Sequence, residues 1–226
     1  TIEEDSSLTL TLSASDVDGD TLTFSATADN ADVQIDGNSL TVTPPGDYNG
    51  LVSVDVVVTD GDLSDWTSFT ISVEPVNDAP VLDALADAVT NEDTAYSVDL
   101  LSSDVDVDAL TYFAQVDGNG TAVVDGSTLT VTPAQDFNGD ILVSVTVSDG
   151  LLSDSDSFTL TVTPVNDAPV LSALDNQVID EDSSLTIELS GSDIDSSELT
   201  FSASDGDSNI SVDGTTLTIT PPADYN

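Results

Sequence analysis

Short runs of apolar residues alternate with polar residues along the whole chain. In the clearest run, Val52, Val54, Val56 and Val58 are separated by Ser53, Asp55, Val57 and Thr59. The same alternation is found at 8–12, 69–73, 96–100, 141–147, 158–162 and 185–189. A period of two is typical of a β-strand with one face on a core. The pattern therefore predicts half-buried strands, and it gives no convincing helix.

The strand pattern recurs together with short motifs at a spacing of 88 or 89 residues. The motifs are Glu4-Asp5, Glu92-Asp93 and Glu181-Asp182; Asp16-Val17-Asp18, Asp104-Val105-Asp106 and Asp193-Ile194-Asp195; Asp47-Tyr48-Asn49-Gly50, Asp136-Phe137-Asn138-Gly139 and Asp224-Tyr225-Asn226; Asp60-Gly61 and Asp149-Gly150; and a heptapeptide at 75–81 and 164–170. A fixed period of this size indicates tandem repeats. We predict repeat one at 1–78 without its first strand, a complete repeat two at 79–167, and repeat three at 168–226 without its last strands.

Repeat two shows the expected fold of one module. Its alternation predicts about seven strands, near 81–85, 94–100, 109–114, 121–125, 127–132, 141–148 and 156–163. Asp-Gly pairs at 36–37, 125–126 and 213–214 lie between short apolar runs, which is typical of hairpin turns. About seven short strands in one repeat indicate an antiparallel Greek-key β-sandwich. The predicted fold class is all-β, with tandem sandwich modules of about 89 residues.

The charge of the chain narrows its possible partners. It has 44 acidic residues and no Lys, Arg or His, which gives a formal net charge of −44. Side-chain ion pairs are therefore impossible, and cations must come from outside to relieve self-repulsion. Nucleic acids and anionic membrane surfaces are poor partners because they bind basic patches. No apolar stretch approaches the roughly 18 residues that a membrane span needs.

The composition also excludes most catalytic chemistry. Without Cys, His or Lys there are no disulfides, thiolate metal sites, nucleophilic triads or Lys and His acid–base pairs. Carboxylate pairs, as in glycosidases, remain possible in principle. They would need one unique pair, whereas the acids here recur in every repeat. We therefore expect no enzyme, and a bound metal is the obvious substitute for disulfides.

The recurring acids indicate which metal. Calcium binds six to eight oxygens from carboxylates, amides and backbone carbonyls in irregular geometry. Carboxylates about 4 Å apart repel one another by on the order of 4 kcal/mol at intermediate dielectric. Acids that gather around the Asn77-Asp78 and Asn166-Asp167 linkers therefore indicate shared calcium sites, and a solvated acidic rim is the alternative. The loop at 16–27 is not an EF-hand, because Thr21 and Thr27 stand where that loop needs Gly and Glu.

Three phrases carry a resemblance to a known family. Ala14-Ser15-Asp16-Val17-Asp18, Val58-Thr59-Asp60-Gly61 and Val76-Asn77-Asp78-Ala79-Pro80 resemble the extracellular cadherin signature. They are still more similar to the bacterial cadherin-like tandem repeats of large secreted adhesins, whose modules commonly end in Val-Asn-Asp-Ala-Pro. The resemblance covers essentially the whole chain. It implies cadherin-like or Ig-like sandwiches arranged as an elongated rod, on a secreted protein of the cell surface.

The resemblance further implies that each joint between repeats takes Ca²⁺ ligands from both neighbours. For the first joint these would be Glu4, Asp47, Asn77, Asp78, Asp104, Asp106 and Asp149. For the second they would be Glu92, Asp136, Asn166, Asp167, Asp193 and Asp195. Asp16, Asp18 and Asp60 would belong to a joint before repeat one. The linker is one residue shorter than in animal cadherins, Pro75 and Pro164 replace its first acid, and a Leu-Asp-Arg-Glu motif is absent, so one or two ions per joint are expected rather than three.

We therefore expect calcium-stiffened extender repeats of an extracellular adhesin or filament protein. Its partners would be calcium ions, neighbouring repeats of the same chain, and like chains in a filament or ligands of the cell surface or matrix. The alternative is a module that itself binds a ligand, either a carbohydrate or a like module. Trp66, Tyr96 and Phe113 interrupt the repeat pattern and are the residues at which such binding would be sought.

Overall fold

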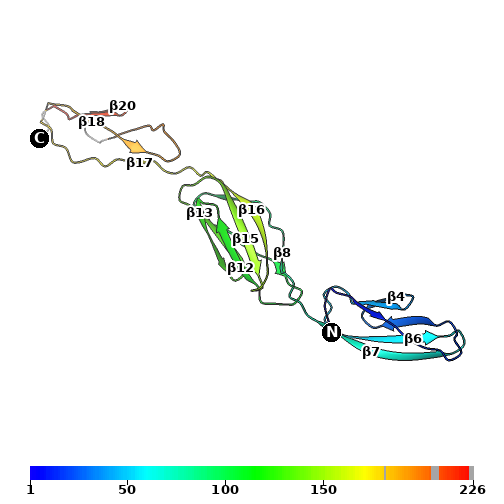
Figure 1. The fold of residues 1–226 in the computed structure, drawn as a ribbon. Coiled ribbons are helices and arrows are strands. Elements are labelled where there is room, and N and C mark those ends of the chain that lie inside the picture. The colour runs from blue at the N-terminus through cyan, green and yellow to red at the C-terminus, as the bar shows by residue number, and fades with distance from the viewer. Residues whose placement is uncertain (181, 205–208, 224–226) are drawn as a thin grey trace. The chain divides into compact units, whose positions relative to one another are not determined.

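In the computed structural model, residues 1–180, 182–204 and 209–223 are described. Every regular element among them is a β-strand (Figure 1), which confirms the predicted all-β fold. They form two compact units. Unit 1 comprises Thr1–Ala84, Leu100–Phe113 and Val145–Asp156, and unit 2 comprises Leu85–Asp99, Ala114–Ser144 and the chain from Ser157 onward. A search of the described residues finds no helix that is long and apolar enough to cross a membrane.

Repeat one lies within unit 1 and consists of two sheets, seen as two layers in Figure 1 (blue to cyan). The four-stranded sheet has the order β1-β7-β6-β3, and the three-stranded sheet has the order β2-β5-β4. The strands are β1 (Ile2–Glu3), β2 (Leu8–Thr11), β3 (Thr23–Ala28), β4 (Asp32–Asp36), β5 (Ser39–Thr43), β6 (Gly50–Thr59) and β7 (Ser64–Glu74). The predicted sandwich is confirmed.

The core between these layers follows the predicted alternation. Leu40 and Val42 of β5 and Val52 and Val54 of β6 have no solvent exposure, and Val73 of β7 is 3% exposed. In the second copy of the pattern, Ile141, Val143, Val145 and Val147 are likewise fully buried. Burial of such side chains contributes about 1.5–3 kcal/mol each. The apolar positions of period two therefore form the core.

Repeat two has nine strands instead of the seven predicted. They are β8 (Val81–Leu82), β9 (Ala88–Asn91), β10 (Tyr96–Asp99), β11 (Ser102–Ser103), β12 (Thr111–Val116), β13 (Gly120–Asp125), β14 (Thr128–Pro133), β15 (Gly139–Ser148) and β16 (Ser153–Thr163). The sheets have the orders β10-β14-β13, β11-β8 and β12-β15-β16-β9. The predicted strand at 81–85 is too long, because the chain leaves the β11-β8 pair after Leu82 and pairs again through β9 in another sheet.

The strand pairing is not entirely antiparallel. β1 pairs with β7 in parallel, and β9 pairs with β16 in parallel, with Ile2 opposite Val73 and Leu160 opposite Ala88. The predicted antiparallel pairing therefore has one short parallel exception in each of these two repeats. Such pairs are two to four residues long, so no periodic pattern could have revealed them. Each of these short strands is followed directly by a buried glutamate, Glu4 after β1 and Glu92 after β9.

Repeat three lies in unit 2. Its described strands are β17 (Val170–Leu171), β18 (Leu185–Glu188), β19 (Gly191–Ser192), β20 (Asn209–Asp213) and β21 (Thr216–Thr220), in the orders β17-β19 and β18-β21-β20. Glu181 and the motif Asp224-Tyr225-Asn226, which the repeat pattern singles out, lie outside the described residues. The Asp-Gly hairpins are confirmed, since Asp36 pairs with Ser39 across a two-residue turn in which Gly37 has a φ of 62°.

Candidate metal centres

Glu4 is the most deeply buried acid of the first joint. It directly follows β1, whose parallel pairing with β7 continues as a hydrogen bond from the Glu4 N–H to the Glu74 carbonyl at 3.0 Å. The residue is 4% exposed, and its Oε1 accepts the backbone N–H of Val76 at 2.5 Å. β1 therefore places a carboxylate against the start of the linker.

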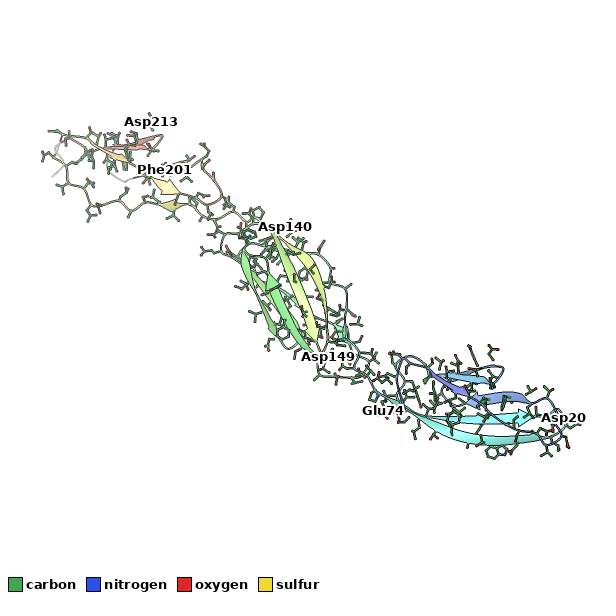
Figure 2. The ribbon with its side chains drawn as sticks, viewed as in Figure 1. Asp20, Glu74, Asp140, Asp149, Phe201 and Asp213 are labelled. Atoms are coloured by element: carbon green, nitrogen blue, oxygen red, sulfur yellow. The ribbon has the colours of Figure 1, made fainter. Side chains whose placement is uncertain are left out.

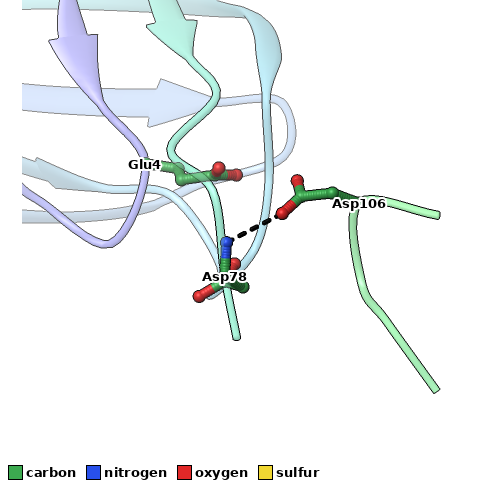
Figure 3. A group of neighbouring side chains, drawn as sticks. All are labelled: Glu4, Asp78 and Asp106. Carbon is green, nitrogen blue, oxygen red and sulfur yellow. Dashed lines mark hydrogen bonds between the residues drawn. The ribbon is translucent and has the colours of Figure 1, made fainter. Parts of the chain in front are cut away.

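The linker itself is held by acids from two loops of repeat two. The backbone N–H of Asp78 donates to Asp106 Oδ2 at 2.8 Å (Figure 3). The side-chain amide of Asn77 donates to Asp149 Oδ2, also at 2.8 Å. All four residues and Glu4 belong to unit 1. The structure thus brings together acids that are far apart in the sequence.

Two groups of three carboxylates share Asp78. We call Glu4, Asp78 and Asp106 the inner cluster, because Glu4 is buried and the other two are half-buried (Figure 3). We call Asp5, Asp47 and Asp78 the outer cluster, because Asp5 and Asp47 are exposed. Within each cluster, one oxygen from every residue lies within 4.8 Å of the others. Oxygens on opposite sides of a calcium ion are about 5 Å apart, since each Ca–O distance is about 2.3–2.6 Å.

The loop after β11 adds a third group to the first joint. One carboxylate oxygen from each of Asp104, Asp106 and Asp108 lies within 4.8 Å of the others. The Asp108 N–H donates to Asp104 Oδ1 at 3.3 Å, whereas Asp104 Oδ2 is buried without a hydrogen-bond partner. Asp106 belongs both to this group and to the inner cluster.

The second joint repeats the inner and outer clusters within unit 2. Its inner cluster is Glu92, Asp167 and Asp195, and its outer cluster is Asp93, Asp136 and Asp167. Glu92 is 4% exposed and accepts the backbone N–H of Val165, as Glu4 does for Val76. The Asp167 N–H donates to Asp195 Oδ2 at 2.6 Å. Asp167 therefore occupies the position in the second joint that Asp78 occupies in the first.

The aspartate that the two clusters of a joint share has a raised pKa in both joints. Burial, followed by repulsion from Asp47, Asp5, Asp106 and Glu4, raises the pKa of Asp78. Burial, followed by repulsion from Asp136, Asp195, Asp93 and Glu92, raises the pKa of Asp167 in the same way. Both shifts mean that the ionised carboxylate is disfavoured where it stands. A cation between these groups would reverse that preference.

The pKa of Asp149 is shifted in the opposite direction to those of Asp78 and Asp167. The hydrogen bond from the Asn77 side chain, followed by the backbone N–H of Leu151, lowers the pKa of the Asp149 carboxyl. Hydrogen bonds to the charged form favour ionisation. Asp149 is therefore held as a carboxylate beside the linker.

Unpaired oxygens test whether a cation fits. Buried polar atoms in folded proteins nearly always have a hydrogen-bond partner. Among the side chains of the described residues, the buried nitrogen and oxygen atoms without such a partner are Asp78 Oδ2, Asp104 Oδ2 and Asp167 Oδ2. All three belong to the carboxylate clusters at the joints. An oxygen-ligated cation is the partner that this chain, which has no cationic side chain, can take from outside.

Several predicted ligands are not in these clusters. Asp16 Oδ1 accepts the N–H groups of Asp18, Gly19 and Asp20, and Asp60 Oδ1 accepts those of Asp62 and Leu63. In the described part of the chain, no carboxylate cluster includes Asp16, Asp18, Asp60, Asp149 or Asp193. Asp20, which lies in the loop before β3, is at the other end of repeat one from Glu74 (Figure 2). Asp193 Oδ1 accepts the N–H groups of Asp195 and Ser196, and Asn166 donates to the Asp167 carbonyl.

The structure adds three acids to the predicted ligands. Asp5 and Asp93 belong to the outer clusters, and Asp108 belongs to the loop cluster. The Glu-Asp motif carries the signal for Asp5 and Asp93, because its second acid recurs with the same period as its first. In both joints the second acid also binds the adjacent loop, since Asp5 Oδ1 accepts the Asp47 N–H and Asp93 Oδ1 accepts the Asp136 N–H, each at 3.2 Å.

The three aromatic residues that interrupt the repeat pattern differ in their surroundings. Tyr96 is half-buried, and its ring centroid lies 6.1 Å from that of Phe158. Trp66 is 69% exposed and Phe113 is 62% exposed. Tyr96 is thus part of the core, and only the other two are available on the surface.

The family model for the bacterial Ig domain matches three successive segments of the chain, residues 1–74, 77–163 and 166–226. The chain belongs to the bacterial Ig domain family. Its repeats are therefore Ig-like domains in tandem, in agreement with the β-sandwiches described above. None of the curated proteins compared with these bacterial Ig repeats matches them.

Several solved structures align with the bacterial Ig repeats at low sequence identity. Human protocadherin-24 EC1-2 is 16% identical over 68% of this chain and 87% of that one, with a TM-score of 0.45. Drosophila N-cadherin EC1-4 is 18% identical over 96% of this chain and 61% of that one, with a TM-score of 0.45. An endo-fucoidan hydrolase from glycoside hydrolase family 107 is 19% identical over 97% of this chain, with a TM-score of 0.36. The chain spans 38% of the length of that hydrolase.

Proposed function

We propose that the chain is a non-catalytic array of extender repeats whose joints are fixed by calcium. The observation that carries the proposal is the buried, unpaired Oδ2 of Asp78 and of Asp167, each between two carboxylate clusters. Buried carboxylates without a partner destabilise a fold. A bound Ca²⁺ converts that repulsion into attraction between acids of two successive repeats.

At the first joint, the inner and outer clusters would each hold one ion. Asp78 would bridge the two ions, Glu4 and Asp106 would complete the inner position, and Asp5 and Asp47 the outer one. The loop cluster of Asp104, Asp106 and Asp108, with Asp149 held ionised nearby, would supply further oxygens. The second joint would use Glu92, Asp195, Asp93 and Asp136 around Asp167. We also propose that the domain boundaries lie after residues 78 and 167.

Without calcium, the joints would be loosened by carboxylate repulsion. With calcium at millimolar concentration, the usual range for extracellular modules, neighbouring repeats would be held in fixed orientations. An extender needs repetition and no unique site, which agrees with clusters that recur at both joints. We infer an extracellular or cell-surface location, because only there is free calcium high enough for such sites.

Thermal melting and small-angle scattering of the chain, with calcium and with a chelator, test the proposal. Calcium should raise Tm and increase the maximum dimension. A double variant, Asp104→Ala with Asp106→Ala, should reduce both effects more than Asp36→Ala, which removes one acid from a hairpin turn. Equal melting and equal dimensions in the two conditions would exclude calcium joints. Equal effects of the two variants would exclude the assigned ligands.

A further inference from the structure

The turn before β13 holds Asn119 at the surface of unit 2. The turn begins at Asp117, whose N–H donates to the Leu142 carbonyl and whose Oδ1 accepts the Leu142 N–H, both at 3.1 Å. It ends at Asn119, whose carbonyl accepts the Ala134 N–H at 2.7 Å. None of the carboxylate clusters found in the described residues includes an acid of this turn. The turn is therefore a surface feature distinct from the candidate metal centres.

Asn119 and the two residues after it match the acceptor pattern for N-linked glycans. The pattern is Asn, any residue except Pro, and then Ser or Thr, and here it reads Asn119-Gly120-Thr121. Asn119 and Thr121 are both exposed. In the described part of the chain, the side-chain amide of Asn119 makes no hydrogen bond. A sugar attached to its nitrogen would therefore displace no protein contact.

The conformation of the turn accounts for the first two residues of the pattern but not for the third. Asn119 has a φ of 57°, a region in which Asn is enriched. A Cβ on Gly120 would lie 2.8 Å from the Thr132 carbonyl oxygen, so Gly avoids a close contact. Thr121 is an exposed residue of β13 opposite Thr132. Nothing in the turn requires a hydroxyl at this position.

Repeat one makes the same kind of turn without the acceptor pattern. Its Asp29 Oδ1 accepts the Ser53 N–H, and Asn30 has a φ of 47°. The next residues are Ala31 and Asp32. The turn thus forms equally with an acid in place of the hydroxyl, which makes Asn30 a natural control for Asn119.

β13 lies at one end of the order β10-β14-β13 and is an edge strand, as β4 is in repeat one and β20 in repeat three. Edge strands have unpaired N–H and C=O groups that can pair with another chain, and charged side chains are one common protection. β4 carries the exposed Asp32 opposite a Thr of the neighbouring strand. At the same register position, also opposite a Thr, β13 has Thr121 and β20 has Asn209. The acid of β4 is thus absent from both other edge strands.

The two edge strands without this acid are the two that have the acceptor pattern. Asn119-Gly120-Thr121 runs into β13, and Asn209-Ile210-Ser211 begins β20. The sequence contains the pattern at these two places and at no others. In β13, Val123 is 61% exposed at the register position where β4 has Gln34. A glycan at Asn119 would cover an apolar edge that lacks the charge of Asp32.

We propose that Asn119 is a glycosylation site and that its N-linked glycan shields the edge of β13. The donor is an oligosaccharide on a lipid diphosphate, which an oligosaccharyltransferase uses during export. A bond forms between Asn119 Nδ2 and the anomeric carbon of the first sugar, the bond from that carbon to the diphosphate oxygen breaks, and the amide loses one proton to solvent. The lipid diphosphate leaves. The proposal rests on the extracellular location proposed above but not on calcium.

Mass spectrometry of the exported chain tests the modification. The whole chain is exported from cells that contain an oligosaccharyltransferase and its lipid-linked oligosaccharide. Because the chain has no Lys or Arg, it is cleaved before Asp, which releases residues 117–124 as one peptide. We expect this peptide to carry one glycan and the peptide with Asn30 to carry none. The result does not depend on whether calcium changes Tm, so it separates this proposal from the calcium joints.

Three variants isolate the acceptor pattern. Asn119→Gly keeps a residue that readily adopts a positive φ and should abolish the glycan. Thr121→Val keeps a β-branched residue in β13 and should also abolish it, whereas Thr121→Ser should retain it. The proposal is overturned if the peptide of the unaltered chain carries no glycan, or if Thr121→Val is modified as fully as the unaltered chain.

Light scattering at high ionic strength tests the shielding of the edge. Salt screens much of the repulsion that a formal charge of −44 imposes between chains. Under these conditions, the Asn119→Gly chain should associate at a lower concentration than the glycosylated chain. Addition of Thr121→Asp, which places an acid where β4 has Asp32, should reverse this difference without a glycan. Equal association of the glycosylated and Asn119→Gly chains would overturn the shielding role.

Discussion

The buried carboxylate of Glu4 accepts the backbone N–H of Val76, 72 residues further along the chain, at 2.5 Å. Glu92 makes the same contact with Val165. Each pair joins the beginning of a repeat to the linker at its end. The glutamate thus has two roles. It accepts a hydrogen bond from a linker N–H, and its carboxylate adds a negative charge to the inner cluster.

These two tasks can be separated by mutation. Glu4→Gln retains an oxygen that can accept the Val76 N–H but removes the charge, whereas Glu4→Ala removes both. In chelator, we expect Glu4→Ala to lower the free energy of unfolding by about 1–3 kcal/mol, because the Val76 N–H loses its hydrogen bond to a buried carboxylate. Glu4→Gln should lower it less. In calcium, both should lose part of the calcium-dependent rise in Tm. Equal losses of both variants in chelator would contradict the role of the hydrogen bond.

Asp78 should show opposite effects of one mutation in the two conditions. Asp78→Asn removes a carboxylate that burial and four acidic neighbours disfavour, so we expect equal or higher Tm in chelator. In calcium it removes the ligand that we propose both ions share, and it should lower Tm. Ion binding at a concentration one hundred times Kd contributes about 2.7 kcal/mol, which is the order of the loss expected for each site that is abolished.

The matched control for that experiment is Asp55→Asn. Asp55 is an exposed residue of β6 and belongs to no carboxylate cluster in the described part of the chain. Differential scanning calorimetry at matched ionic strength measures both variants. If Asp55→Asn also gave an equal or higher Tm in chelator and a lower Tm in calcium, general charge reduction would explain both changes. Asp78 would then have no specific role in calcium binding.

The number of bound ions should depend on Asp5 and Asp93. Each contributes to one outer cluster and to no inner cluster. We expect Asp5→Ala and Asp93→Ala each to lower the calcium stoichiometry by one ion per chain, and the double variant to lower it by two, as measured by equilibrium dialysis. An unchanged stoichiometry in the double variant would exclude calcium binding at the outer clusters. Binding at the inner clusters would still be possible.

The repeat period, the sandwich and the linker acids could be predicted from the sequence, because they depend on local patterns. Val52 and Val54 alternate with polar residues, and Asn77-Asp78 recurs as Asn166-Asp167. The assignment of Asp5 could not be predicted so directly. It depends on the backbone of Asp47, which has a φ of 56° and an N–H that points to Asp5 from 42 residues away. The two-residue strand β8 was equally hidden, since its length is set by pairing with β11.

The stability of the calcium-free chain should rise as the pH falls from 7 towards about 4. The folded-state pKa values of Asp78 and Asp167 are raised above their ordinary value of 3.8. The folded state therefore binds more protons than the unfolded state in this window, and the free energy of unfolding decreases with rising pH. The lowered pKa of Asp149 has the opposite effect on the free energy of unfolding. That effect lies at pH values below the ordinary pKa of 3.8, outside this window. Chemical denaturation in chelator at several pH values measures the slope.

Calcium should reverse that dependence. Protons and calcium compete for the same oxygens, so the calcium-dependent gain in stability should shrink as the pH falls. The variant with both Asp78→Asn and Asp167→Asn should show a flatter profile in chelator than the unaltered chain. An unchanged profile in this variant would assign the pH dependence to the net charge of −44 alone.

Val107 lies in the acidic loop at the first joint with a φ of 63°, a conformation that a β-branched residue rarely adopts. The corresponding residue of repeat one is Gly19, with a φ of 84°. A left-handed conformation costs an L-residue about 1–2 kcal/mol, and glycine adds less than this in unfolded-state entropy. We therefore expect Val107→Gly to raise the free energy of unfolding by about 0.5–1 kcal/mol. Val105→Gly, two residues earlier and outside the positive-φ region, should lower it, and equal effects of the two variants in urea denaturation would contradict the strain at Val107.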